Sequence, residues 1–243
     1  MSLGNKIHFK HFLAKTAVPD LTRESLYFSL KGLQAYLLKH RVVTPSPTLL
    51  SYLHQLTREG LIHSAGRGWY STVAKPFELD TEVVTPLVAM LGNKFPLLDF
   101  SVWSTAQIAM YGHHLTEKFL YFIRAERDGM TSVYDYLRES GWNTYLNPTQ
   151  ADAKKFFRLE KNTAVVRPSV TQAPVKDHFV QVEGILVDLF VETADLGFMD
   201  RQEFIAIARS ISASGRLDLG TLSRYAVNRR RLDINSFLRG WIN

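Results

Sequence analysis

Cysteine is absent from the 243 residues of this chain, which excludes disulfide bonds, thiolate metal sites and cysteine nucleophiles. Long apolar runs are absent as well, since no stretch approaches the roughly 18 residues that a membrane-spanning helix requires. The first ten residues also lack the apolar core of a secretory signal. These absences favour a protein of the reducing cytoplasm, with room for two modest domains.

Sequence patterns of common catalytic sites are missing too. There is no glycine-rich phosphate loop, and no serine lies in the context of a nucleophile elbow. His113 and His114 are adjacent, and neighbouring residues on a helix point in different directions, unlike the ligands of a helical zinc site. We therefore predict that the chain is not an enzyme and that it holds neither a cofactor nor a metal ion.

Positive charge is what the sequence has in excess, and it is unevenly distributed. Residues 1–75 contain ten lysines and arginines against three acidic residues, whereas residues 76–170 and 171–243 are close to neutral. Five of the eight histidines also lie in this basic segment. A basic segment attached to a neutral body is typical of proteins that contact nucleic-acid phosphates. A membrane-surface helix is disfavoured, because the charged and aromatic residues are not segregated.

The basic segment carries the pattern of a helix-turn-helix. The leucines of residues 26–37 recur at spacings of three and four, so we expect one helix that begins after Thr22. Residues 42–45 are too few and too rich in turn signals to form another helix, so they predict a turn. A second helix is expected from Ser46, with a proline in its first turn and Gly60 at its end.

The polar side of the second helix and the end of the first supply the expected DNA contacts. A hairpin wing should follow, built from two short strands around the turn Ala65–Gly68. In a winged helix the second helix can lie in the major groove, while an arginine of the wing reaches a phosphate or the minor groove. Tyr52 is expected to pack or to contact the sugar–phosphate backbone rather than a base. The residues predicted to bind double-stranded DNA are Lys39, Arg41, Thr48, Ser51, Tyr52, Gln55, Arg58 and Arg67.

Beyond an acidic linker at Glu78–Asp80, apolar strands alternate with helices, and this order predicts a small α/β domain. The expected strands are 98–103, 119–123, 144–146 and 164–166. The expected helices are 82–91, a helix that Thr105 caps, 130–139 and 148–157. The remainder has a helical pattern, with helices expected at 182–189, 202–212, 219–230 and 234–241.

These patterns predict an α+β protein in three parts. Residues 1–75 form a winged helix-turn-helix DNA-binding domain, and residues 76–170 form the small α/β domain. Residues 171–243 form a helical C-terminal segment that packs on the α/β domain. The sequence fixes neither the oligomeric state nor the DNA sequence that is bound.

One acidic residue, Asp188, lies within an apolar helical run and needs a partner if it is buried. We expect it to form a structural ion pair with one of four arginines near the C-terminus. These are Arg224, Arg229, Arg230 and Arg231. Alternatively, the Arg229–Arg231 cluster binds an acidic partner surface or a second stretch of DNA.

A nuclease-like core is the main enzymatic alternative for the α/β domain. Asp99 and Glu126 are placed on neighbouring strands as the acids of a metal-dependent nuclease would be. However, Glu126 is followed by Arg127 and Asp128, so the lysine that would activate water is missing. A degenerate core without metal is the weaker form of this alternative. A third hypothesis is a protein-interaction adaptor whose winged helix binds no DNA.

Several short stretches spread over the chain carry a resemblance to a known family. They are Leu49–Leu53, Gly60–Ile62, Gly66–Tyr70, Phe100–Thr105 with His113 and His114, Ile185–Leu189, Arg224–Ala226 and Arg229–Arg230. In their order they resemble the AbiEi-type antitoxins and related regulators of bacterial abortive-infection, or type IV toxin–antitoxin, systems. The resemblance implies an autorepressor that binds its own promoter and opposes a neighbouring nucleotidyltransferase toxin without a stable complex. Only the winged-helix positions are carried over as DNA contacts.

Overall fold

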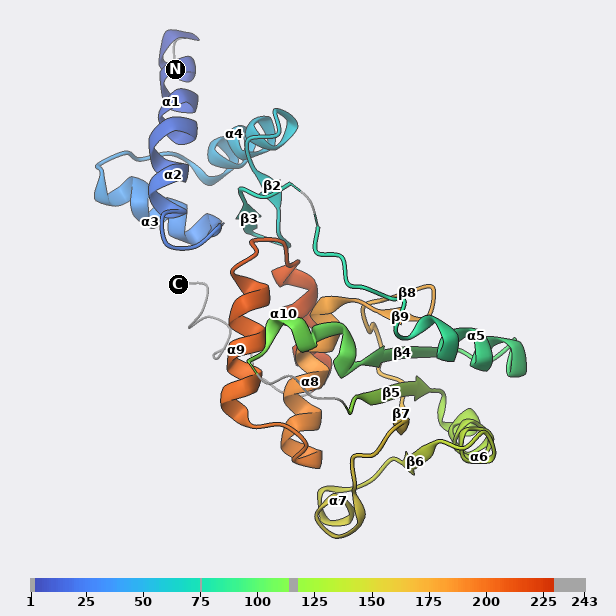
Figure 1. Cartoon of the computed structure of the whole chain (residues 1–243). Helices are drawn as coiled ribbons and strands as arrows, with labels where there is room; N and C mark the ends of the chain where they lie inside the picture. The colour runs from blue at the N-terminus through green and yellow to red at the C-terminus, as the bar shows by residue number, and fades with distance from the viewer. Residues whose placement is uncertain (1–2, 75, 114–117, 230–243) are drawn as a thin grey trace. The chain divides into compact units, whose positions relative to one another are not determined.

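The computed structural model describes residues 3–74, 76–113 and 118–229 (Figure 1). The chain divides into two compact units. Of the described residues, the first unit comprises those in 3–77 and 212–223, and the second comprises those in 78–211 and 224–229. Both units combine helices with a sheet, which confirms the predicted α+β class. The segment Ser212–Ser223, which we had expected to pack on the α/β domain, belongs to the first unit.

The first unit is a winged helix-turn-helix. Its elements are α1 (Leu3–Phe12), a π-helical turn (Leu13–Ala17), α2 (Val18–Leu21), β1 (Tyr27–Ser29), α3 (Leu30–Lys39), α4 (Ser46–Arg58), β2 (His63–Ser64) and β3 (Trp69–Ser71). β3 pairs antiparallel with both β1 and β2, so the strands lie in the order β1-β3-β2. The helices α3 and α4 form the helix-turn-helix, and β2 and β3 form the wing.

The core of the first unit lies between α3, α4 and the segment that follows α1. Leu49, Leu53 and Leu56 of α4 are fully buried, and their spacings of four and three place them on one face of the helix. Leu33 of α3 and Leu13 of the π-helical turn are buried in the same cluster. Burial of each such leucine contributes about 1.5–3 kcal/mol. This core therefore holds α4 with its other side toward solvent.

The predicted first helix of the helix-turn-helix begins too early. Thr22 ends α2, and β1 precedes α3. Phe28 of β1 stacks on Tyr70 of β3 with ring centroids 5.4 Å apart. Ser29 then caps α3, because its hydroxyl accepts a hydrogen bond from the N–H of Gly32. Strand pairing and aromatic packing thus override the leucine spacing that predicted a helix here.

The second unit is built on a six-stranded mixed sheet with the strand order β6-β7-β5-β4-β9-β8. The strands are β4 (Phe100–Ser104), β5 (Leu120–Ala125), β6 (Asn143–Leu146), β7 (Thr163–Pro168), β8 (Val175–Lys176) and β9 (Phe179–Val180). β4 is antiparallel to β5, and β7 is parallel to both β5 and β6. The four predicted strands are confirmed as β4 to β7. β8 and β9 were missed, because two residues are too few to show an alternating pattern.

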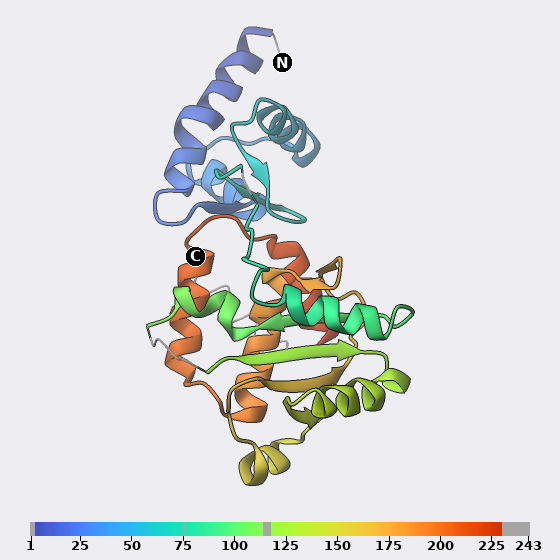
Figure 2. The same cartoon turned by 45° about the vertical axis from the view of Figure 1, so that its right-hand side comes forward.

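Helices cover both faces of this sheet (Figure 2). The helices that follow residue 78 are α5 (Thr85–Lys94), α6 (Met130–Glu139), α7 (Gln150–Phe156), α8 (Val182–Leu196), α9 (Arg201–Ser212) and α10 (Leu219–Asn228), with short 3-10 turns at Thr105–Tyr111 and Arg127–Gly129. Ser104, not Thr105, caps the first of these turns, in a capping box with Gln107. The helix expected at 234–241 lies outside the described residues.

Alternation along the strands assigns side chains to the two faces of the sheet. Val102, Ile123 and Val166 lie in one buried cluster with residues of α5 and α6. The intervening residues Phe122 and Arg124 point to the opposite face, where Arg124 reaches α8. Throughout the described ranges, every helix is too short or too polar to span a bilayer.

Candidate nucleic-acid interface

The solvent side of α4 carries a polar stripe. Ser51, His54 and Arg58 are exposed, and their spacings of three and four place them on one face of the helix. Thr48 and Gln55, which flank this stripe, are half-buried. His54 was not among the predicted contacts, although its position three residues after Ser51 is the signal that identifies it. The stripe offers hydroxyl, imidazole and guanidinium groups side by side.

Tyr52 does not lie on the exposed side of α4, where we had placed it. Its side chain is only 6% exposed. Its ring meets that of Phe9 edge-on, with centroids 5.1 Å apart. The reason is helical geometry, since Tyr52 lies three residues after Leu49 and four before Leu56, on the apolar face. Of the two roles expected for Tyr52, it has the packing role.

The first unit carries exposed cations on its helix-turn-helix and on its wing. Lys39 and Arg41 lie at the end of α3, and Arg67 lies at the tip of the wing; all three are exposed, as is Arg58. Within the described residues, none of these four forms an ion pair. The structure therefore leaves four positive side chains on the helix-turn-helix and its wing.

Two of the three acidic residues of the basic segment form ion pairs with other cations. Asp20 forms an ion pair with Arg23 at 2.8 Å, and Glu59 forms one with Lys10. Asp20 also accepts a hydrogen bond from the hydroxyl of Tyr36 at 2.6 Å, and this bond raises the pKa of Tyr36. Two of the three carboxylates of the segment are thus occupied by other cations.

The wing is a very short hairpin. Its turn is closed by hydrogen bonds from the N–H of Trp69 to the carbonyl of Gly66, and from the N–H of Ala65 to the carbonyl of Trp69, both at 3.0 Å. Gly66 and Gly68 have φ angles of 104° and 78°, which side chains other than glycine rarely adopt. These two glycines place Arg67 at the tip of the turn.

A buried network of ion pairs lies between the sheet and the helices of the second unit. Arg124 of β5 and Arg167 of β7 are partners in the strand register, so two cations lie side by side on one buried face. Asp188 and Glu192, one turn apart on α8, face them. Arg124 Nε lies 2.8 Å from Asp188 Oδ2, and Arg167 Nη2 lies 2.7 Å from Glu192 Oε2.

Two residues of the C-terminal part of the chain complete this network. Arg229 Nε lies 3.1 Å from Asp188 Oδ1, which confirms the predicted structural ion pair. Tyr225 donates a hydrogen bond from its hydroxyl to the same oxygen at 3.0 Å. Burial, and secondly the charge of Asp188, raise the pKa of Tyr225. Arg230 and Arg231 lie outside the described residues. We name Arg124, Arg167, Asp188, Glu192, Tyr225 and Arg229 the buried ion network.

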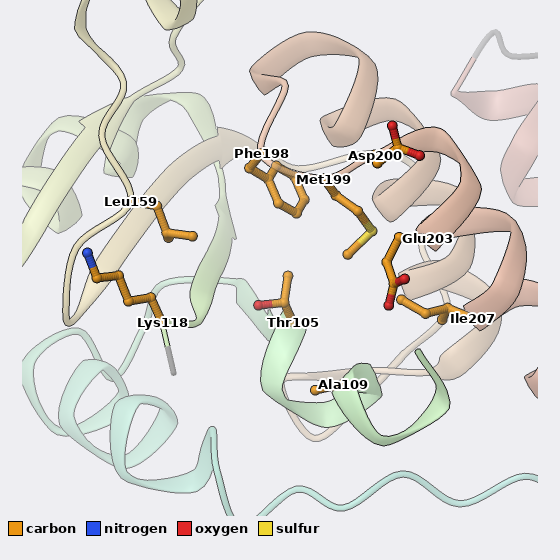
Figure 3. A pocket seen from close by; sticks show the side chains of 9 residues that line it. All are labelled: Thr105, Ala109, Lys118, Leu159, Phe198, Met199, Asp200, Glu203 and Ile207. Atoms are coloured by element: carbon orange, nitrogen blue, oxygen red, sulfur yellow. The ribbon is translucent and has the colours of Figure 1, made fainter. Parts of the chain in front are cut away.

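A pocket of about 220 Å³ lies in the second unit (Figure 3). Its lining is mainly apolar, and Figure 3 shows Lys118 on the side opposite Asp200 and Glu203. Both carboxylates already accept hydrogen bonds from backbone N–H groups. Asp200 accepts from the N–H of Gln202 at 2.6 Å, and Glu203 accepts from the N–H of His113 at 2.7 Å. The described lining contains no nucleophile with an adjacent base, so the pocket supports no catalytic proposal.

Asp99 and Glu126, the acids of the nuclease hypothesis, do not belong to a cluster of possible metal ligands within the described residues. Asp99 and Glu126 are both exposed and flank the paired residues Phe100 and Ala125 at one end of β4 and β5. Among the described residues, no three or more histidine, aspartate or glutamate side chains gather closely enough to hold a metal ion. His113 is exposed, and His114 lies outside the described residues.

The first unit has the element order and the three-stranded antiparallel sheet of a winged helix. The chain belongs to a family of unknown function, DUF6577, whose model matches residues 48–240. The matched region begins in α4 and includes the wing and the whole six-stranded sheet. Comparison with curated proteins gives no significant match.

Proposed function

We propose that the first unit binds double-stranded DNA and that the chain is a transcriptional regulator. The observation that carries this proposal is the polar stripe of α4, which lies on the second helix of a helix-turn-helix and includes the exposed Arg58, while three more exposed cations lie on α3, the turn and the wing. The second helix is the element that enters the major groove in helix-turn-helix proteins. Arginine, serine and histidine are side chains that can donate to base edges or phosphates there.

The arrangement divides these contacts into two kinds. Ser51, His54 and Arg58 face outward from α4 and are the proposed base-edge contacts, with Thr48 and Gln55 at their margin. Lys39 and Arg41, outside α4, are proposed to contact phosphates. The first turn of α4 has no side-chain cap, so its backbone N–H groups and the positive end of the helix dipole also favour a phosphate.

The finer proposal is an autorepressing antitoxin that acts in the cytoplasm. It rests on the resemblance of short stretches to the AbiEi-type antitoxins and not on any site of the second unit. In this proposal the first unit represses the chain's own promoter. The second unit is assigned the opposition to a nucleotidyltransferase toxin.

The proposal is tested by fluorescence anisotropy of the full chain on a duplex from its own upstream region and on a scrambled duplex. We expect preference for the upstream duplex and an affinity that falls steeply as salt is raised. Arg58→Ala should weaken binding about fivefold or more. Arg127→Ala, which removes an exposed arginine of the second unit, is the matched control and should leave binding unchanged. Equal, weak binding to both duplexes would favour the adaptor hypothesis.

A further inference from the structure

The wing of the first unit is held by a segment that lies far along the chain. The N–H of Leu219 donates to the carbonyl of Ala65 in the wing turn at 2.8 Å. The N–H of Leu217 donates to the hydroxyl of Tyr27 in β1 at 2.6 Å, and the hydroxyl of Ser71 in β3 donates to the carbonyl of Gly215. Residues 215–219 therefore contact the wing turn and the paired strands β1 and β3.

Two glycines bring the backbones of this segment and of the wing turn into direct contact. A Cβ atom built on Gly66 would lie 2.2 Å from the backbone nitrogen of Gly220. A Cβ atom built on Gly220 would lie 2.9 Å from the nitrogen of Arg67 and 3.0 Å from the Cα of Gly66. Since these neighbours are backbone atoms, neither can move aside without moving the turn.

This contact limits how the wing can meet DNA. The minor groove of B-DNA is about 6 Å wide. Two adjacent backbones lie about 4.7 Å apart, and the atoms and side chains on either side add to this spacing, so the thickness of the pair exceeds the width of the groove. A turn with Leu219 and Gly220 packed against it is therefore too thick to enter that groove. The side chain of Arg67 stays exposed at the tip and can reach a phosphate.

We propose that Leu217–Gly220 clamp the wing turn, so that Arg67 contacts a DNA phosphate rather than base edges of the minor groove. Gly220 is then a positioning residue for this contact. The inference rests on the DNA binding proposed above and assigns a role within it. It also makes residues 217–220, which lie far along the chain, a support of the wing.

The test measures the slope of log affinity against log salt for the full chain on the upstream duplex. One phosphate contact contributes about 0.9 to this slope. We expect Arg67→Ala to lower the slope by about 0.9 and to weaken binding to the upstream and scrambled duplexes by the same factor, about fivefold. Arg67→Lys should retain the slope. Gly220→Ala should lower the slope as Arg67→Ala does, and the double variant should lower it no further.

Gly92→Ala is the matched control, because Gly92 also lies in a helix and a Cβ atom there would meet nothing within 4 Å. A general loss of folded protein would reduce the active fraction without changing the slope, and thermal unfolding reports it separately. If Gly220→Ala does not fold, Asp218→Ala replaces it. This variant removes the hydrogen bond from the N–H of Thr221 to Asp218, which loosens the start of α10. It should therefore lower the slope as Gly220→Ala does.

The outcomes separate this inference from the proposed function. If the wild-type chain shows no salt-dependent binding, the DNA-binding proposal fails. If the wild type binds but the position-220 or position-218 variant keeps the full slope, only the clamp is overturned. A loss in Arg67→Ala that is confined to the upstream duplex would show base recognition by the wing and would also overturn the inference.

Discussion

The two units surround arginine in opposite ways, although each contains several. Arg58 and Arg67 of the first unit are exposed and, within the described residues, form no ion pair. Arg124 and Arg167 of the second unit are only 2% and 8% exposed, and acidic side chains of α8 face them. The guanidinium groups of the first unit are therefore accessible to a charged partner, whereas those of the second unit are bonded within the fold.

This difference shows why charge must be considered together with pairing. A desolvated arginine is tolerated only when a carboxylate and further hydrogen bonds replace its water. Arg167 meets this condition, since it also donates to the carbonyl of Pro148 at 2.7 Å. The exposed arginines retain their water until a ligand displaces it. We therefore assign binding to the first unit and stability to the buried ion network.

We expect the largest change in stability from a substitution in the buried ion network. Asp188→Asn leaves Arg124 and Arg229 without their shared carboxylate in a buried site, and we expect the free energy of unfolding to fall by about 3–5 kcal/mol. Denaturant unfolding of the full chain measures this. Asp135→Asn, at an exposed position of α6, is the control and should be within about 0.5 kcal/mol of wild type. Equal stability of the two variants would show that the network is not structural.

A smaller loss of stability is expected from Tyr225→Phe. The change removes one hydrogen bond to the charged Asp188 and keeps the ring, so the free energy of unfolding should fall by about 1.5–3 kcal/mol. Tyr136→Phe is the matched control, because its hydroxyl has no hydrogen-bond partner among the described residues. A Tyr225 variant as stable as this control would mean that the hydroxyl contributes nothing to the network.

For the exposed Arg58 we expect the reverse, with little change in stability and a loss of DNA affinity. Arg58→Ala should change the free energy of unfolding by no more than about 0.5 kcal/mol, because the side chain is exposed and unpaired within the described residues. Its cost should instead appear in DNA affinity, as about 1–3 kcal/mol of lost binding free energy. Parallel unfolding and anisotropy measurements check this. A variant that is destabilised but binds normally would reverse the assignment of roles.

The smallest expected effect concerns a charge that is exposed yet locally bonded. Asp152 accepts hydrogen bonds from the hydroxyl and N–H of Thr149 in the capping box of α7, and these bonds lower the pKa of its carboxyl below 3.8. Because the folded pKa is lowered, the stabilisation is complete above the unfolded value and is lost as pH falls through the folded value. The protection of the amides at the start of α7, measured as their exchange rate relative to the intrinsic rate at each pH, should fall over that range. In Asp152→Asn this pH dependence should disappear.

Local patterns predicted the elements that are periodic and long. α4 and α6 show helical spacing, and β4 to β7 are apolar segments bounded by polar turns, so their positions followed from the sequence. β1 did not, because Tyr27 and Phe28 extend a leucine-rich segment and become a strand only through pairing with β3. Strand pairing between distant segments is not encoded in a local period.

The long-range partners escaped prediction for the same reason. Asp188 was identified as an acid in need of a partner, but Arg124, which lies 64 residues away, was not named. A charged residue inside the apolar run of β5 is the signal that could have found it. The contact of Leu219 with Ala65 left no such signal, since it is made by backbone atoms.

We propose that the chain meets DNA through α4 and the wing and not through the second unit. Hydrogen exchange of the full chain with and without the upstream duplex tests it directly. We expect slower exchange in α4 and at residues 65–68 when DNA is added, with unchanged exchange in β4, β5 and β7. Unchanged exchange in α4, together with slower exchange in the strands of the second unit, would contradict it.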